Sequence, residues 1–402
     1  METGKMKVDF SIDNGNAILS LEGRLDTNAV PQATDDVFRL LDEQQSIKDL
    51  VCDIKDVTYI SSSGLRMLLH LAKQYPDFHI VGAQPEVYQV LDLTGFTKMM
   101  KVERALRKLD VKGCDVIGKG GVGVVYRLDD DTIIKVFREG STMREVQAEI
   151  IMAKEAFVLG MPTAISFDVV QVGNRYGLVY ELLKADTLSA CIKREPERME
   201  EFARLYAGIF RQLHAIQVPQ NGLIPSAMER EECAVRRISR YFDTASVDLL
   251  LRIVQKIPVA NRLLHCDLQT KNAMMGGDEL MLIDMGEIGY GHPILDLGHA
   301  YSSMVSLLGD YEEVIGIPRD YGIRFWKRML PYYFEGESPE MIAHRESQME
   351  VVGTVRNFSW LSLSDSFPET LIRECQQAFN ERVTKRKDYL LDICDTFDDW
   401  VL

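Results

Sequence analysis

The sequence has 402 residues, of which 46% are hydrophobic and 27% charged, and its formal net charge is −15. This length allows two or three globular domains, each with a core of its own. The negative charge argues against nucleic acid as a partner, because a phosphate backbone attracts clustered Lys and Arg. No apolar run is long enough to cross a bilayer, and the first residues lack the apolar core of a signal peptide.

The seven cysteines are scattered along the chain and never follow the spacing C-x-x-C. Such usage favours reduced thiols over disulfides or a zinc site. We therefore expect a cytoplasmic protein that does not contact a membrane.

The N-terminal part alternates short strands and helices. Strands are predicted over residues 7–13, 17–21, 50–54 and 78–81, with a tight hairpin turn at residues 14–15. Helices are predicted over residues 29–45, 65–74 and 85–93. The pattern predicts a small α/β domain, a mixed sheet with helices, over residues 1–109.

Residues 56–69 of this part read Asp-Val-Thr-Tyr-Ile-Ser-Ser-Ser-Gly-Leu-Arg-Met-Leu-Leu. Gly-Arg-Leu-Asp stands upstream at 23–26, and Val-Leu-Asp-Leu-Thr-Gly-Phe stands downstream at 90–96. Together these stretches resemble a STAS domain of the anti-sigma-factor-antagonist type. The resemblance implies a regulatory phosphorylation site at Ser62 and a surface that meets a protein partner. In that family an acidic residue usually precedes this serine, whereas here Ser61 does.

A serine at the start of a helix allows two interpretations. Its hydroxyl can cap the helix, or a phosphate on it can meet free N–H groups and the positive end of the helix dipole. For Ser62 we favour the cap. Residues 104–112 follow as a short charged linker without proline, so we expect the two domains to touch.

A glycine-rich stretch in the order G-x-G-x-x-G comes next, an order that Rossmann folds and kinases share. A Rossmann loop opens a helix, whereas here residues 124–128 and 132–137 both have the β-branched, apolar character of strands. Strand, glycine turn and strand predict the loop that covers the phosphates of ATP in kinases. The second strand places Lys135 where a lysine contacts the α- and β-phosphates. The loop residues predicted to bind the nucleotide are Gly118, Lys119, Gly120, Gly121 and Gly123.

A helix is predicted over residues 143–159, and it offers Glu145, Glu149 and Glu155 as partners for Lys135. Two more strands are predicted, over residues 164–172 and 176–183.

The second of these strands ends in a hinge, where backbone groups from Glu181 to Leu183 can hydrogen-bond adenine. Beyond the hinge the sequence becomes largely helical. We expect His214, in a helix predicted over residues 199–217, to be a core histidine.

The most informative stretch, residues 265–272, reads His-Cys-Asp-Leu-Gln-Thr-Lys-Asn and is followed by Asp-Met-Gly at 284–286. Phosphoryl transfer needs a carboxylate that orients the accepting hydroxyl and takes its proton, which Asp267 can do. It also needs oxygen ligands for metal ions that neutralise the triphosphate, which Asn272 and Asp284 can supply. Apolar runs on both sides predict two short strands that bracket a catalytic loop, with the polar groups on a rigid hairpin.

Residues 113–402 resemble the aminoglycoside phosphotransferase/choline kinase branch of the protein-kinase-like fold. The resemblance rests on residues 265–272 and on Gly-Tyr-Gly-His-Pro-Ile-Leu-Asp at 289–296, with Gln269 where protein kinases usually have lysine. It implies an α+β fold, with an N-lobe sheet over residues 110–183 and a largely helical C-lobe over residues 184–402.

The same resemblance implies ATP and Mg²⁺ as cofactors and a hydroxyl of a small molecule as the acceptor. Asp267 is then the catalytic base, Asn272 and Asp284 are the magnesium ligands, and Lys135 binds the ATP phosphates. Glu149 becomes the partner of Lys135, because its spacing to residues 160–163 matches the related small-molecule kinases. Asp296 is expected to accept hydrogen bonds from the backbone of the catalytic loop.

Three other functions stay open. The chain can be a protein serine kinase that acts on Ser62 or on free STAS proteins, although a peptide-docking segment is missing between Asp284 and Asp296. It can be a signalling scaffold that only binds ATP. It can also be an antibiotic-resistance enzyme, since an acidic C-terminal half suits a cationic substrate. The sequence favours an ATP- and Mg²⁺-dependent small-molecule kinase that is regulated, or docked to a partner, through its STAS domain.

Overall fold

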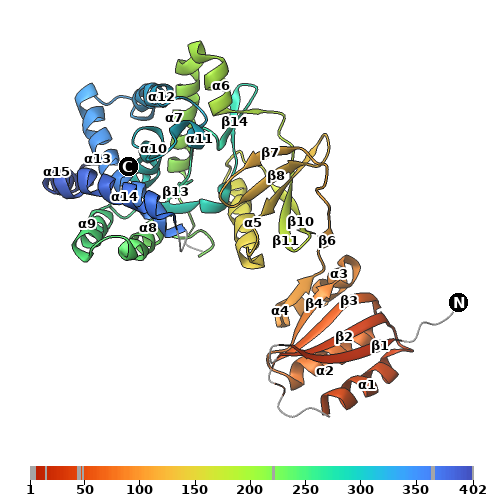
Figure 1. Cartoon of the computed structure of the whole chain (residues 1–402). Helices are drawn as coiled ribbons and strands as arrows, with labels where there is room; N and C mark the ends of the chain where they lie inside the picture. Colours follow the sequence, from red (N-terminus) through yellow and green to blue (C-terminus); the bar gives the residue numbers. More distant parts are fainter. Residues whose placement is uncertain are drawn as a thin grey trace. The chain divides into compact units, whose positions relative to one another are not determined.

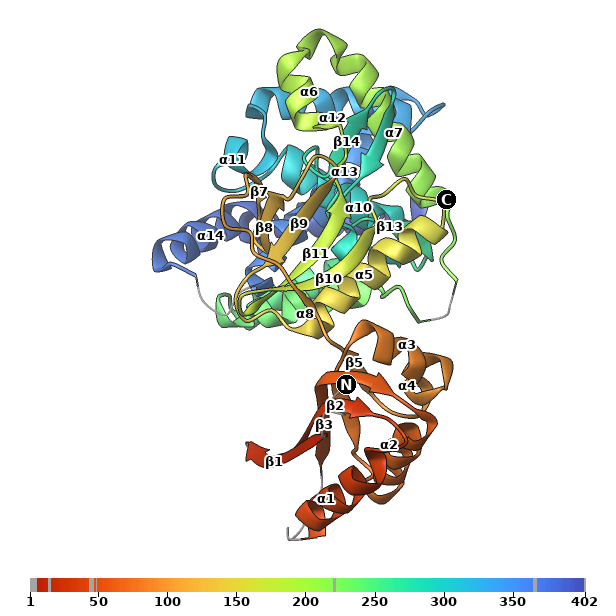
Figure 2. The ribbon, with the colours of Figure 1, turned by 90° about the vertical axis from the view of Figure 1, so that its right-hand side faces the viewer.

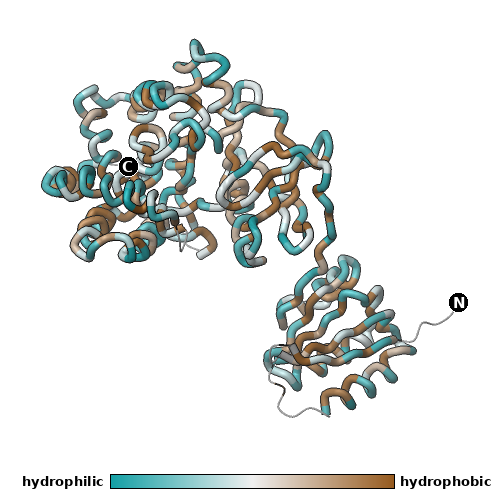
Figure 3. Tube along the Cα trace, viewed as in Figure 1, coloured by the Kyte–Doolittle hydropathy of each residue, from teal (hydrophilic) through white to brown (hydrophobic). Residues whose placement is uncertain are grey.

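The computed structural model describes residues 6–13, 16–42, 47, 49–219, 222–363 and 367–400. The chain divides into two compact units, one of residues 1–110 with 169–173 and one of residues 111–168 with 174–402. Each unit combines strands and helices (Figure 1). Hydrophobic residues follow the strands of both units, and hydrophilic residues gather at the turns (Figure 3). No helix of the described residues is long and apolar enough to span a membrane.

The first unit is built on a five-stranded sheet in the order β1-β2-β3-β4-β5. β1 and β2 are antiparallel, whereas the other neighbours run parallel. The strands are β1 (Lys7–Asp13), β2 (Asn16–Leu25), β3 (Leu50–Ile60), β4 (His79–Ala83) and β5 (Val102–Arg104). The helices are α1 (Val30–Asp42), α2 (Ser62–Gln74), α3 (Pro85–Leu93) and α4 (Phe96–Met99).

The burial pattern along β2 indicates that one face of this sheet is covered. Ala17, Leu19 and Leu21 are buried, whereas the residues between them are only partly covered. A burial period of two is typical of a sheet that packs through one side. Helices α1 to α4 lie along one side of the strands (Figure 2).

The predicted α/β class of this unit is confirmed, with differences at the element ends. β3 runs on to Ile60 and α2 begins at Ser62, so both extend beyond the residues predicted from apolar periodicity. The predicted hairpin turn at residues 14–15 lies outside the described residues, as does most of the last turn of the helix predicted over residues 29–45.

A six-stranded sheet in the order β6-β10-β11-β9-β8-β7 precedes the helical part of the chain. The two-residue strand β6 falls within the predicted linker and pairs in parallel with β10. The elements are β6 (Arg107–Lys108), β7 (Val116–Lys119), β8 (Gly123–Arg127), β9 (Thr132–Phe137), α5 (Met143–Val158), β10 (Ser166–Val172) and β11 (Arg175–Glu181).

Helix α5 begins with a capping box. The Thr142 hydroxyl accepts a hydrogen bond from the Glu145 N–H at 3.3 Å, and the Glu145 carboxylate accepts one from the Thr142 N–H at 2.7 Å. This reciprocal pair satisfies two amide donors that a helix start leaves free. Glu145 is therefore engaged in the cap and is not available to Lys135.

The rest of the second unit is largely helical, as predicted, with two small sheets of order β12-β14-β15 and β13-β16. The strands are β12 (Asp186–Thr187), β13 (Arg262–Leu264), β14 (Ala273–Gly276), β15 (Glu279–Leu282) and β16 (Gly289–Gly291). The α-helices are α6 (Leu188–Arg194), α7 (Met199–Ala215), α8 (Ala227–Arg237), α9 (Thr244–Gln255), α10 (Pro293–Met304), α11 (Tyr311–Ile315), α12 (Arg319–Tyr333), α13 (Pro339–Ser359), α14 (Glu369–Arg382) and α15 (Lys387–Cys394).

The two strands that bracket the catalytic loop differ from the prediction in one respect. β13 pairs with β16 and β14 pairs with β15, so they belong to different sheets and form no common hairpin. The loop crosses from one small sheet to the other. Strand pairing of this kind is set by residues distant in sequence, which a local apolar pattern does not reveal.

Helices α10 and α13 approach each other closely through glycine. A Cβ atom on Gly298 would lie 2.5 Å from Val352 Cγ1, and one on Gly353 would lie 2.8 Å from the Gly298 carbonyl oxygen. Such contacts are too short for any larger side chain. This packing fixes the C-terminal half of α13 against the helix that follows the predicted active site.

Candidate active site

A buried carboxylate on α10 holds the catalytic loop, residues 265–272. Asp296 is 1% exposed and accepts hydrogen bonds from the His265 N–H at 2.9 Å and the Cys266 N–H at 2.8 Å. Nε2 of the buried His214, on α7, lies 3.2 Å from the same carboxylate. These contacts agree with the predicted roles of Asp296 as a support of the loop and of His214 as a core histidine.

Both carboxylate oxygens of Asp267 are hydrogen-bonded. Gln269 Nε2 donates to Oδ1 at 2.9 Å, and Asn272 Nδ2 donates to Oδ2 at 3.2 Å and to the Asp267 carbonyl at 2.8 Å. Burial raises the pKa of Asp267 above its ordinary value, while the positive charge of Arg356 opposes the rise. A raised pKa makes a carboxylate a stronger proton acceptor. The contacts orient the carboxylate, and its burial increases its affinity for a proton.

Asn272 and Asp284 lie on neighbouring segments. The Ile283 N–H donates to the Asn272 carbonyl at 3.0 Å, directly before Asp284. The antiparallel pair β14 and β15 connects the two residues. Asp284 has a left-handed backbone conformation, with φ of 60°, and its side chain is 43% exposed. The hairpin therefore holds the two predicted metal ligands just outside the paired ends of β14 and β15.

The oxygen atoms available here fit Mg²⁺, which prefers oxygen ligands. Asn272 turns its Nδ2 toward Asp267, so that its Oδ1 accepts no hydrogen bond from any described residue, and the same is true of Asp284 Oδ2. Within the described ranges, no group of three or more His, Cys, Asp or Glu could hold a metal ion. A magnesium ion at this place needs further oxygens, such as those of nucleotide phosphates.

Lys135 on β9 lies between two carboxylates. Its Nζ is 2.9 Å from Glu149 Oε1, 3.0 Å from Glu149 Oε2 and 2.9 Å from Asp284 Oδ1. Burial lowers the pKa of Lys135, but the two negative charges outweigh burial and raise the pKa above its ordinary value. The ammonium group is therefore charged at neutral pH. Of the three acids that the sequence offered, Glu149 is the partner.

Tyr180 is a member of this cluster that the sequence analysis missed. Its hydroxyl donates to Glu149 Oε1 at 2.8 Å. Leu178 is paired with Lys135 across β11 and β9, and Tyr180 is two residues further along β11. Residues two apart in a strand share a face. The sequence signal that could have revealed Tyr180 is a hydroxyl-bearing residue in the strand that pairs with β9, on the same face as the residue opposite Lys135.

The glycine-rich loop joins β7 to β8, as predicted, and the Gly120 N–H donates to the Gly123 carbonyl at 3.0 Å. A Cβ on Gly123 would lie 2.2 Å from the Val136 carbonyl oxygen, so only glycine fits beside β9. Nothing lies within 4 Å of a Cβ built on Gly120 or Gly121. The tip of the loop is thus open, and Gly118 and Lys119 belong to the strand that leads into it.

The predicted hinge begins where β11 ends, at Glu181. The N–H of the next residue, Leu182, donates to the Asp131 carbonyl at 2.7 Å, which ties the hinge to the turn before β9. The Leu183 N–H makes no hydrogen bond within the described part of the chain. It is therefore free to bind a ligand.

In the first unit, the helix cap is formed by Ser61 and not by Ser62. Ser61 Oγ accepts from the Gly64 N–H at 3.4 Å and donates to the Leu25 carbonyl at 2.9 Å. Ser62 is the first residue of α2 and is exposed. The favoured interpretation of Ser62 as a cap is therefore wrong, because the residue before it occupies the capping position.

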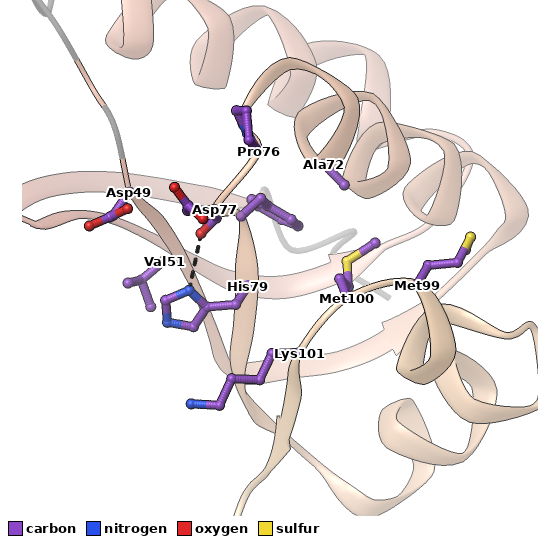
Figure 4. A pocket seen from close by; sticks show the side chains of 10 residues that line it. Asp49, Val51, Ala72, Pro76, Asp77, His79, Met99, Met100 and Lys101 are labelled. Atoms are coloured by element: carbon purple, nitrogen blue, oxygen red, sulfur yellow. Dashed lines mark hydrogen bonds between the residues drawn. The ribbon is translucent and has the colours of Figure 1, made fainter.

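A hollow of about 600 Å³ lies in the same unit, at the far end of β3 from Ser62. It is lined by residues at the starts of β3, β4 and β5, among them Val51, His79 and Lys101 (Figure 4). The ring of His79 bonds to the Asp77 carbonyl, and Lys101 is paired with Glu103 at 2.6 Å. The polar groups of His79 and Lys101 therefore already have partners within the unit.

Comparison with known proteins gives a family for each part. The model of the STAS domain matches residues 7–109, and that of the phosphotransferase enzyme family matches residues 116–332. The chain is also similar to the solved structure of an ADP-bound aminoglycoside phosphotransferase. That likeness has 15% identity and a TM-score of 0.44, and it covers 73% of this chain and 96% of the other.

Two further likenesses are to an ethanolamine kinase and to a choline/ethanolamine kinase family protein. An ethanolamine kinase of Plasmodium vivax matches with 12% identity and a TM-score of 0.48, over 87% of this chain and 96% of the other. A choline/ethanolamine kinase family protein of Mesorhizobium loti matches with 16% identity and a TM-score of 0.43, over 70% of this chain and 92% of the other.

The chain belongs to the phosphotransferase enzyme family, because that family's model covers more than half of its length. It is a kinase whose acceptor is an alcohol group, and it carries an N-terminal STAS domain. The predicted family resemblances and the predicted enzyme class are confirmed.

The hydrogen bonds from the catalytic loop to Asp296 give a testable prediction. Burial raises the pKa of Asp296, but hydrogen bonds from His214 and the His265 backbone outweigh burial and lower the pKa below its ordinary value. An ionised group of this kind stabilises the fold above its unfolded pKa and loses that effect as the pH falls through its folded pKa. Asp296→Asn leaves a donor facing backbone donors and should destabilise the second unit by roughly 3 kcal/mol at neutral pH.

Urea unfolding followed by tryptophan fluorescence measures this effect. All three tryptophans (326, 360 and 400) lie in the second unit. The stability difference between wild type and Asp296→Asn should be full above about pH 5 and should shrink below about pH 4. A difference that stays constant across this range would contradict the assigned ionised state.

Proposed function

We propose that this kinase uses ATP and Mg²⁺ and transfers the γ-phosphoryl group to a hydroxyl of a small molecule. The observation that carries the proposal is the position of Lys135, which lies 2.9 Å from both Glu149 and Asp284. In kinases, a lysine paired with a helix glutamate must be in place together with a metal-binding aspartate before ATP can react. Membership of the phosphotransferase family supports the same reaction.

In this proposal each residue of the cluster has one task. Asp267 accepts the proton of the acceptor hydroxyl as its oxygen bonds to the γ-phosphorus and the bond from that phosphorus to the β,γ-bridging oxygen breaks, leaving ADP. Lys135, held by Glu149, binds the α- and β-phosphates. Asn272 and Asp284 hold Mg²⁺, which neutralises the negative charge of the triphosphate.

The remaining predicted residues bind the nucleotide. Backbone groups of Glu181 and Leu183 pair with the base, and the open tip of the glycine-rich loop covers the phosphates. The free Leu183 N–H and the space around Gly120 and Gly121 support these roles.

A small acceptor is favoured over a protein acceptor by the short path from Asp284 to α10. The chain forms a 3₁₀ turn at Met285–Glu287, pairs with β13 through β16 and enters α10 at Pro293. Protein kinases place a long activation segment here and use it as a platform for peptides. This chain has no room for one.

We further propose that the STAS domain regulates the kinase or docks a protein partner through the start of α2. Ser62 is exposed there and takes no part in the helix cap, which supports its availability for modification. A phosphate at this place would add roughly −2 charge beside free helix N–H groups.

The role of Asp267 predicts a loss of turnover without a loss of ATP binding. Asp267→Asn should lower the rate of phosphoryl transfer by a factor of about 10² to 10⁴ and leave ATP affinity near that of the wild type. Asp284→Ala is the contrasting variant. It should weaken ATP binding when Mg²⁺ is present and change it little when Mg²⁺ is absent.

Calorimetric titration with ATP, with and without Mg²⁺, together with a coupled ADP assay, separates these outcomes. Full turnover by Asp267→Asn would reject that residue as the base. An equal loss of ATP affinity by Asp284→Ala in both titrations would reject its role in holding the metal.

The role of Ser62 predicts that Ser62→Asp and Ser62→Ala differ from each other in kinase rate while unfolding like the wild type. Ser61→Ala is the control. It removes the cap and should cost the first unit about 1 kcal/mol of stability. Identical kinase rates for the two Ser62 variants would contradict regulation through this residue.

A further inference from the structure

Two residues of α10 contact the catalytic loop from one face of the helix. Asp296 accepts hydrogen bonds from the N–H groups of His265 and Cys266. His299 is three residues further along α10, and residues three apart share a helix face. Its Nδ1 lies 2.9 Å from the Cys266 carbonyl oxygen. A carbonyl oxygen only accepts hydrogen bonds, so Nδ1 carries a proton and is the donor.

The peptide group between Cys266 and Asp267 is held at both of its polar atoms. Its carbonyl accepts from His299, and its N–H donates to His265 Nδ1 at 3.3 Å. Nε2 of His265 lies 3.3 Å from the Ile283 carbonyl oxygen, which fixes that ring in turn. A peptide group is planar, so hydrogen bonds at its two ends fix its orientation. This orientation sets the direction in which the chain enters Asp267.

The backbone of Cys266 depends on support of this kind. Among the described residues other than glycine, only Cys266 and Asp284 have a positive φ, and that of Cys266 is 64°. A left-handed conformation is unfavourable for a residue with a Cβ atom and persists only where the surroundings hold it. Rotation to an ordinary conformation would turn the Cys266 carbonyl away from its present direction. The hydrogen bond from His299 opposes that rotation.

A buried carboxylate on α8 lies against the other nitrogen of the same ring. His299 Nε2 is 3.4 Å from Glu231 Oε2, which is within ion-pair distance although the two atoms are not aligned as a hydrogen bond. Both side chains are buried. The partner of one imidazole nitrogen determines the orientation and protonation of the ring. Glu231 therefore keeps Nδ1 directed at the catalytic loop.

We infer that His299 is a positioning residue for phosphoryl transfer, because its Nδ1–H fixes the peptide group that leads into Asp267. This inference rests on the proposed function, in which Asp267 is the base. A base must lie within hydrogen-bond reach of the proton that it removes. Loss of the contact from His299 should therefore slow the transfer step and leave the binding of ATP unchanged.

Two substitutions of His299 separate this role from a merely structural one. The side-chain nitrogen of asparagine occupies the place of Nδ1, whereas that of glutamine reaches the place of Nε2. His299→Asn therefore keeps a donor toward Cys266, and His299→Gln keeps a donor toward Glu231 alone. A positioning role requires the first donor, while a structural pair with Glu231 requires the second.

The first measurement is the release of ADP from Mg²⁺ and ATP by the full-length protein, with water and then glycerol as the acceptor hydroxyl. His299→Gln should lower kcat by roughly tenfold to a hundredfold, with a KM for ATP within about twofold of the wild type, because small displacements of reacting groups have effects of this size. His299→Asn should recover most of that loss.

The matched control is His344→Gln. His344 also lies beside a carboxylate, with its Nε2 3.9 Å from Asp399 Oδ2, but it is on α13 and has no contact with the catalytic loop among the described hydrogen bonds and ion pairs. This variant should turn over like the wild type. Urea unfolding followed by tryptophan fluorescence verifies that each variant is folded.

The second measurement does not depend on turnover. Hydrogen exchange of the full-length protein, followed by mass spectrometry, reports the opening of residues 263–272. His299→Gln should speed exchange in this stretch by about fivefold, as expected for the loss of one hydrogen bond, and leave exchange in β8 and β9 unchanged. His299→Asn should exchange like the wild type.

Equal kcat values for the two folded His299 variants would overturn the inference. So would exchange in residues 263–272 of His299→Gln that matches the wild type, or that rises equally in β8 and β9. Failure of the proposed function gives a different result. In that case Asp267→Asn keeps its turnover, or the wild type releases no ADP, while the two His299 variants still differ in hydrogen exchange.

Discussion

The ion pair between Lys135 and Glu149, extended to Asp284, is the interaction on which the site depends. It joins a strand, a helix and the end of a hairpin that are far apart in sequence. The Glu149 carboxylate is shared between the Lys135 ammonium and the Tyr180 hydroxyl, and is buried. Removing one member of a buried charge pair leaves the other uncompensated, which is strongly unfavourable. The three elements therefore have one mutually consistent arrangement.

A second constraint fixes the position of Asp267 in the catalytic loop. Asp296 uses both carboxylate oxygens to fix the backbone at His265 and Cys266, so the following residue, Asp267, has a defined position. Close packing at Gly298 fixes α13 relative to the same helix. The residues that we propose to bind the nucleotide all lie within residues 116–332, the stretch that matches the family.

Much of this site could be predicted from the sequence, because the spacing of His265, Asp267 and Asn272 and the glycine order are local features. The partner of Lys135 could not be identified from the helix sequence alone, because three acids lie on that helix. Only the structure shows that Glu145 is engaged in the capping box. The cap at Ser61 depends on a carbonyl at Leu25, which no local pattern indicates.

The measurement that tests the central claim most directly follows the γ-phosphate itself. The full-length protein is incubated with ATP labelled in that phosphate, Mg²⁺ and pools of small hydroxyl compounds, and small molecules are then separated from protein. The account predicts label in a small-molecule product, formed by the wild type and lost in Asp267→Asn. Label found only on protein, or only in inorganic phosphate whatever compound is supplied, would contradict it.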